Sequence, residues 1–140
     1  MTLIRFRTDE AHEEPAGTLD EFLGQSNATA VRLEAGEDAR ALIPYLDRLA
    51  LIEIAFPAFR DGRGYSAARI LREAGYVGEL RAQGDILLDQ VIDYRRCGFD
   101  ALASEAPLDP QAVEEALARF PAVYQKAADD RAPVWKLRHG

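Results

Sequence analysis

The residues best suited to binding chemistry lie in the stretch 56–66, which joins an apolar run to the start of an amphipathic segment. If a helix begins there, its first backbone N–H groups and its dipole favour an anion. Arg63 adds a planar guanidinium that fits oxyanions, and Ser66 adds a hydroxyl. We therefore predict an anion site built from Gly62, Arg63, Gly64 and Ser66. The alternative is structural: the two glycines permit a tight turn and Ser66 satisfies loop N–H groups.

Arg81 is the second arginine that we expect at this site. It lies in a predicted strand over 78–82. Because parallel sheets bind ligands beyond the carboxyl ends of their strands, Arg81 and Arg63 are expected to meet at one rim. Secondary candidates from neighbouring helices are Arg69, Asp89 and Arg96. Ion pairing along helix faces is the competing explanation for most of these arginines.

Two carboxylates are the only acid-base pair that the sequence offers at comparable positions. Asp61 and Asp85 each follow a predicted strand, so they could converge at the same sheet edge and act as catalytic groups. The alternative is that both aspartates cap turns or helices, as aspartate commonly does.

Other catalytic equipment is sparse. His12 and His139 fall near the two ends, and Cys97 is the single cysteine, expected to be a buried and inert thiol. No metal site is predicted. The pattern G-x-G-x-x-A at Gly62, Gly64 and Ala67 stands too far from the preceding strand for a dinucleotide fingerprint. No cofactor is therefore evident, although a flavin or nicotinamide stays open for an enzyme.

Composition narrows the classes of partner. The net charge is −7 and the pI about 4.8, which opposes binding to nucleic acid. The apolar runs are far shorter than a membrane span, and no secretory signal pattern opens the chain, so we expect a cytoplasmic protein. Its 140 residues fit one domain. Residues 60–100 are neutral, with seven arginines against seven acids, so the remainder carries the negative charge.

Alternating short apolar runs and helical patterns predict a single α/β domain over residues 1–140. Strands are expected near 3–6, 30–33, 51–56, 78–82 and 99–103. Helices are expected between them, with Pro44 bending the first, Ser66 and Asp85 capping the next two, and Asp109–Pro110 opening the last. This alternation favours a mainly parallel sheet flanked by helices. We prefer an open, doubly wound sheet to a curved partial barrel.

The flanking segments lack a clear pattern. Residues 9–21 carry six acids and no Lys or Arg, which predicts a solvated acidic loop. Residues 122–140 are expected to form an irregular C-terminal tail that docks through Val134, Trp135 and Leu137.

Residues 56–100 resemble the signature of a bacterial family of unknown function. The matching pieces are FPAFRDGRGYSAARILRE, GELRAQGDILLDQ and RRCGFDAL. Members are commonly described as oxidoreductases of sulfite reduction and are encoded beside the sulfite reductase haemoprotein. The resemblance thus implies a link to sulfate assimilation and a haemoprotein partner, but it transfers no catalytic residue. The motif positions carried over are Asp61, Gly62, Arg63, Ser66, Arg69, Arg72, Arg81, Gly84, Asp85, Asp89, Gln90, Arg96, Cys97, Gly98 and Phe99.

Three functions remain open from sequence. The first is an accessory protein of sulfite reduction that binds sulfite reductase or a small oxyanion. The second is a small oxidoreductase or other enzyme that uses Asp61 and Asp85 beside an arginine-lined pocket. The third is a structural or oligomerisation module, and a homo-oligomer is compatible with all three.

Overall fold

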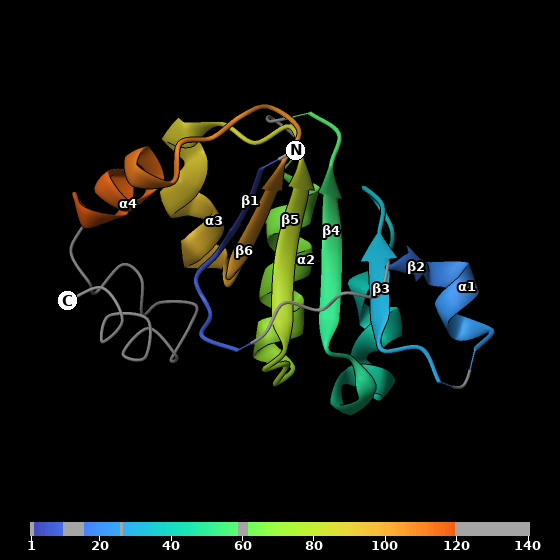
Figure 1. Cartoon of the computed structure of the whole chain (residues 1–140). Coiled ribbons are helices and arrows are strands. Elements are labelled where there is room, and N and C mark those ends of the chain that lie inside the picture. The colour runs from blue at the N-terminus through green and yellow to red at the C-terminus, as the bar shows by residue number, and fades with distance from the viewer. Residues whose placement is uncertain (1, 10–15, 26, 59–61, 120–140) are drawn as a thin grey trace.

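The sheet is mostly parallel, and its strands after the first lie in the order in which they occur along the chain. The computed structural model describes residues 2–9, 16–25, 27–58 and 62–119. The six strands stand in the order β1-β6-β5-β4-β3-β2, and only β1 is antiparallel to its neighbour (Figure 1). The strands are β1 Thr2–Arg5, β2 Gly17–Thr18, β3 Ala30–Leu33, β4 Leu51–Phe56, β5 Glu79–Gly84 and β6 Ala101–Ser104. The predicted α/β fold with an open, mainly parallel sheet is confirmed.

Helices connect the parallel strands one by one. The connecting helices are α1 Leu19–Leu23, the 3₁₀ helix η1 Ala39–Arg48, α2 Arg63–Glu73, the 3₁₀ turn η2 Leu88–Gln90 and α3 Val91–Cys97, and α4 Pro110–Ala118 follows β6. Pro44 lies inside η1. Because proline cannot donate a backbone hydrogen bond and crowds the preceding turn, an α-helix is disfavoured there.

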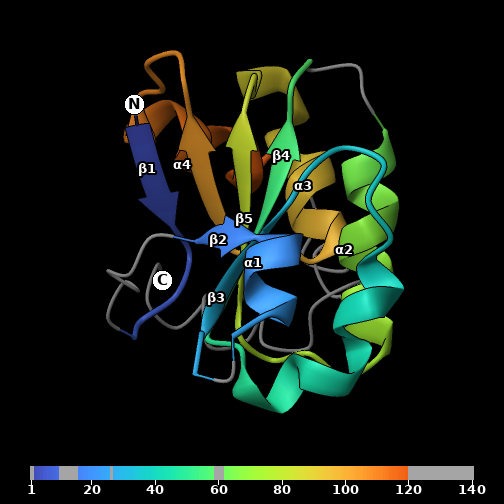
Figure 2. The ribbon, with the colours of Figure 1, turned by 90° about the vertical axis from the view of Figure 1, so that its right-hand side faces the viewer.

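The winding of the sheet differs from our expectation. From β2 to β6 each strand lies next to its predecessor, so the strand order never reverses. Right-handed crossovers then place every connecting helix on the same face. Figure 2 shows η1, α2 and α3 together on one side of the sheet. The doubly wound arrangement is therefore wrong, and so is the switch-point crevice that would accompany it.

The hydrophobic core lies between that face and the helices. Strand residues of one parity, such as Val31, Ile52 and Leu80, join the core cluster, and the described helices supply its other members, among them Leu71 and Val91. β4 contributes Ile52, Ile54 and Phe56. Its nearly continuous apolar run correctly predicted a strand, and Glu53 faces the side opposite the core cluster, where it pairs with Arg32 and Arg81.

Local signals succeeded at some helix ends and failed at others. Asp109 caps α4 by accepting from the Gln111 N–H, and Gly98 ends α3 with a left-handed φ of 108°. By contrast, α2 begins three residues before Ser66, and Asp85 precedes the extended residue Leu87 that opens η2. Ser66 and Asp85 are therefore not helix caps.

Part of the predicted acidic loop is ordered secondary structure. Its last residues form β2 and the start of α1, where Thr18 and Glu21 make a reciprocal capping box. That pairing satisfies N–H groups at the helix start and offsets the low apolarity of the segment. The loop prediction is wrong for residues 17–21. Residues 10–15 and the predicted tail at 122–140 lie outside the described residues.

Candidate functional site

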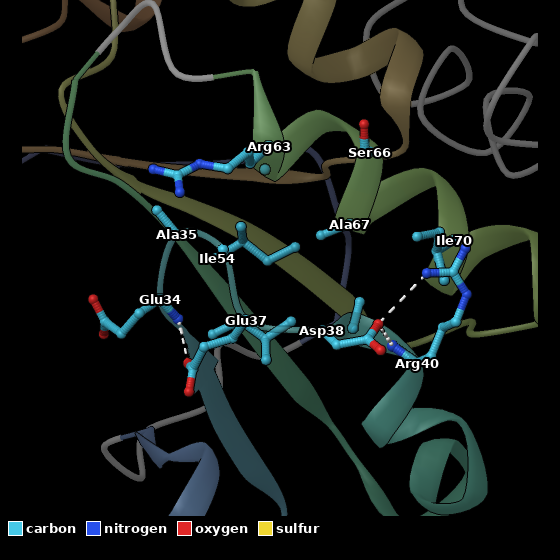
Figure 3. Close-up of a pocket in the computed structure, with 14 residues that line it drawn as sticks. Glu34, Ala35, Glu37, Asp38, Arg40, Ile54, Arg63, Ser66, Ala67 and Ile70 are labelled. Atoms are coloured by element: carbon cyan, nitrogen blue, oxygen red, sulfur yellow. Dashed lines mark hydrogen bonds and ion pairs between the residues drawn. The ribbon is translucent and has the colours of Figure 1, made fainter.

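A pocket opens where β3 and β4 end and α2 begins. It encloses about 240 Å³ and is lined by the turn 34–40, the end of β3, Ile54 of β4 and the first two turns of α2. Figure 3 shows Ile54 of β4 and Ala67 of α2 beside the space between that turn and the helix. The carboxyl ends of parallel strands are the usual ligand-binding edge of such sheets, and this pocket lies at that edge.

Arg63 brings a positive charge to the rim. It is the first residue of α2, and its Nη1 atom lies 3.0 Å from the point where a Cβ on Gly36 would stand. Gly36 has a φ of 88° and no side chain, so the turn can pass beneath the guanidinium. The N-cap of α2 is Gly62, which makes no side-chain cap. The partial positive charge of the helix start therefore adds to that of Arg63.

Three carboxylates also border the pocket, and each has a protein partner. Glu37 accepts the backbone N–H of Glu34 at 2.7 Å. Asp38 accepts the Arg40 N–H at 3.0 Å and pairs with its guanidinium at 3.6 Å. Glu34 is bound by Arg32 at 2.7 Å. With Arg32, Arg40 and Arg63 nearby, these charges balance locally despite the acidic chain.

The predicted loop residues have separate roles in the structure. Neither Gly62 nor Gly64 has a positive φ, so no tight turn requires them. Gly64 instead lies against Phe56: a Cβ there would stand 2.8 Å from Phe56 Cε1. Ser66 borders the pocket, but it is exposed and its hydroxyl points away from the centre (Figure 3). Of the predicted anion site, Arg63 and the start of α2 remain as candidates at this pocket.

Arg81 lies elsewhere. It pairs with Glu79 at 3.0 Å and with Glu53 at 3.7 Å, on the sheet face opposite the core cluster. These contacts belong to a row of alternating charge that crosses the sheet and consists of Arg5, Glu79, Arg81, Glu53, Arg32 and Glu34. Arg63 follows β4 on the helix side. The expectation that both arginines share one rim is therefore wrong.

Of the predicted catalytic pair, Asp85 lies within the described residues and Asp61 does not. Asp85 follows β5 and donates its backbone N–H to the Phe56 carbonyl at 2.9 Å. Asp61 lies outside the described residues, so the proposed convergence of Asp61 and Asp85 stays a prediction.

The secondary candidates do not line the pocket at Arg63. Asp89 lines a groove between α3 and α4. Arg69 is exposed on α2, and a hydrogen bond with Cys97 raises the pKa of its guanidinium. Arg96 lies on α3 beside Cys97, whose thiol is buried as expected. Among residues 2–9, 16–25, 27–58 and 62–119, no cluster of His, Cys, Asp or Glu is arranged to hold a metal.

The turn 34–40 is the part of the site that sequence reasoning missed. Its residues carry no recognisable motif that would mark them as part of a site. One feature of the sequence could have indicated it: the turn follows a predicted strand, as the stretch 57–62 does. Carboxyl ends of adjacent parallel strands lie at the same edge, so the two turns were bound to be neighbours once β3 and β4 paired.

The fold and pocket define a singly wound α/β domain with a small site at the carboxyl edge of its sheet. Residues 30–135 match the model of a family described as bacterial proteins of unknown function, DUF934. This match covers well over half of the chain, and the chain belongs to that family. No curated protein and no solved structure matches it. Within the described part, none of the helices has the length and apolarity to cross a membrane.

Proposed function

We propose that the protein is an accessory of sulfite reduction that binds a small oxyanion in the pocket at Arg63. The observation that carries the proposal is the meeting of Arg63, the start of α2 and the turn at Gly36 around one cavity. The resemblance of residues 56–100 to proteins encoded beside the sulfite reductase haemoprotein supplies the link to sulfite. A role beside that enzyme places the protein in the cytoplasm.

The chemistry of the site supports binding in preference to electron transfer. Arg63 can direct two N–H groups at an oxyanion, and the adjacent helix start adds a positive end. Cys97, the single cysteine of the chain, is buried at the end of α3 and is absent from the pocket lining. The proposed role is thus to hold sulfite, or a related anion, for a partner that carries the redox centre.

Calorimetric titration tests the anion site. The full chain is titrated with sulfite, sulfate and phosphate, and sulfite or sulfate is expected to bind at the start of α2. Arg63→Gln should weaken that binding at least tenfold, because it removes a charge-assisted contact worth about 1.5 to 3 kcal/mol. Arg69→Gln is the matched control, since it removes the same charge from an exposed position on the same helix. Equal affinity in all three proteins, or no binding in any, contradicts the proposal.

Co-purification tests the partner. Affinity-tagged protein is expected to retain the sulfite reductase haemoprotein from cells grown on sulfate as the sulfur source. The haem absorbance of the eluate gives a direct measure. A clean eluate, with the haemoprotein present in the unbound fraction, argues against the partner while leaving anion binding to the titration.

A further inference from the structure

The turn that follows β3 is closed by two hydrogen bonds between the same two residues. The backbone N–H of Glu37 donates to the Glu34 carbonyl at 3.1 Å. In return, the backbone N–H of Glu34 donates to Oε1 of Glu37 at 2.7 Å (Figure 3). This second bond ends on a carboxylate, which makes it stronger than a bond between neutral groups. The Glu37 side chain therefore helps to hold residues 34–37 in one shape.

The same turn lies against the guanidinium of Arg63. Gly36 is the third residue of the turn, and its φ of 88° together with the ordinary φ of Ala35 defines a type II turn, which favours glycine at that place. A Cβ on Gly36 would stand 3.0 Å from Arg63 Nη1 and 3.9 Å from Cζ. The guanidinium thus packs on the backbone of a turn that Glu37 closes.

Such a support matters for an arginine at the surface. Arg63 is exposed, and a long side chain that samples many rotamers loses entropy when a ligand holds it in one of them. A fixed turn beside the guanidinium reduces this loss, because part of the ordering has taken place before the ligand binds.

We infer that Glu37 is a positioning residue of the oxyanion site. Its carboxylate holds the turn whose Gly36 backbone supports the Arg63 guanidinium, and it does not bind the anion. The inference rests on the proposed function and adds the residue that prepares the site. It also gives a role to a negative charge that borders the same pocket as Arg63, where electrostatic repulsion alone would disfavour it.

Two substitutions of Glu37 separate positioning from charge. Glu37→Gln keeps an oxygen that can accept the Glu34 N–H, whereas Glu37→Ala does not, and both remove the same negative charge. In calorimetric titrations of the full chain, sulfite affinity should be about twofold to tenfold lower for Glu37→Ala than for Glu37→Gln, the usual cost of immobilising one long side chain. Equal affinity in the two variants, with sulfite still bound, would overturn this inference alone.

Glu34→Ala is the matched control. It removes a carboxylate from the same turn, where that side chain pairs with Arg32, but it leaves the backbone groups that close the turn. Its sulfite affinity should not fall below that of the wild type. A loss as large as that of Glu37→Ala would show that any carboxylate of the turn has the same effect, and it would contradict a special role for Glu37.

The mobility of Arg63 gives a measurement that needs no ligand. Nitrogen-15 relaxation of its Nε–H group, without sulfite, should show restricted motion in the wild type and in Glu37→Gln, and larger motion in Glu37→Ala. Equal mobility in the three proteins would overturn the positioning role. Restricted motion without sulfite binding in any protein would overturn the proposed function, and with it the purpose of the positioning.

Discussion

Helix α2 has an arginine at each end: one donates hydrogen bonds to acceptors of the fold, and the other lies exposed beside a pocket. Arg72, at its C-terminal end, donates to the carbonyls of Tyr76, Gly78 and Gly98 at 2.9 Å each, and to Asp100 at 3.1 Å. Arg63, about 14 Å away along the same helix, lies exposed at the rim of a pocket. The buried pair of Arg72 and Asp100 thus stabilises the amino end of the sheet, whereas Arg63 at the carboxyl end is exposed to solvent.

Asp100 is the central hydrogen-bond acceptor at the amino end of the sheet. It is 2% exposed, accepts Arg7 at 2.7 Å as well as Arg72, and accepts the backbone N–H of Leu80 at 2.8 Å. One carboxylate therefore joins the segment after β1, the end of α2 and the start of β5. The difference between the two ends shows that arginine content alone does not locate a ligand: Arg72 holds acceptors of the fold, whereas Arg63 lines a pocket.

Removing Arg72 should have the largest effect. Arg72→Met leaves three carbonyls and a buried carboxylate with fewer donors, so the free energy of unfolding should fall by about 3 to 5 kcal/mol. Urea unfolding followed by circular dichroism measures it. Arg69→Met, on the exposed side of the same helix, should cost under about 1 kcal/mol. Similar losses in both variants would show that the hydrogen bonds of Arg72 do not stabilise the amino end of the sheet.

The sequence predicted the elements better than their assembly. The apolar run of β4 and the Asp109–Pro110 start of α4 are local signals, and each was realised. Strand order depends instead on how successive strand-helix units pack on one another. Nothing local distinguishes a doubly wound sheet from one whose helices all lie on one face, so the winding was not predictable from these patterns.

The prediction that Arg81 lies beside Arg63 was wrong for a different reason. The strand reads Glu79-Leu80-Arg81-Ala82, and this alternation already assigns Arg81 to the face opposite Leu80. Only the singly wound order, however, places α2 with Arg63 on the Leu80 face. The pairing of Arg72 with Asp100 was not predictable from local sequence patterns either, because the two residues are 28 positions apart.

Gly64 tests how closely the pocket depends on helix packing. Alanine normally stabilises a helix relative to glycine, yet a Cβ at position 64 would overlap the ring of Phe56. Gly64→Ala should therefore lower the free energy of unfolding by about 1 to 2 kcal/mol, and it should weaken anion binding by displacing Arg63. At Gly62 a Cβ meets nothing within 4 Å, so Gly62→Ala should cost under about 1 kcal/mol. A stabilised Gly64→Ala variant would refute the packing argument.

The smallest of these effects on stability should come from Asp9, at the amino end of the sheet, and should depend on pH. Asp9 is bound by Arg7 at 2.9 Å and by Arg5 at 2.9 Å, and the hydrogen bond from Arg7 is the main cause that lowers the pKa of its carboxyl to about 2. A depressed folded-state pKa stabilises the native state above the unfolded value near 4, and this contribution disappears as the pH falls from about 4 to about 2.

The measurement is the difference in unfolding free energy between wild type and Asp9→Asn at pH 2, 3, 4 and 6. The wild type should be the more stable protein at pH 6, and the difference should vanish near pH 2. Because the Asp9 side chain is 55% exposed, solvent screening keeps the difference small. A difference that stays constant with pH would show that Asp9 acts through packing and not through its charge. Sulfite affinity at pH 6 should be the same in both proteins, since the pocket lies at the opposite end of the sheet.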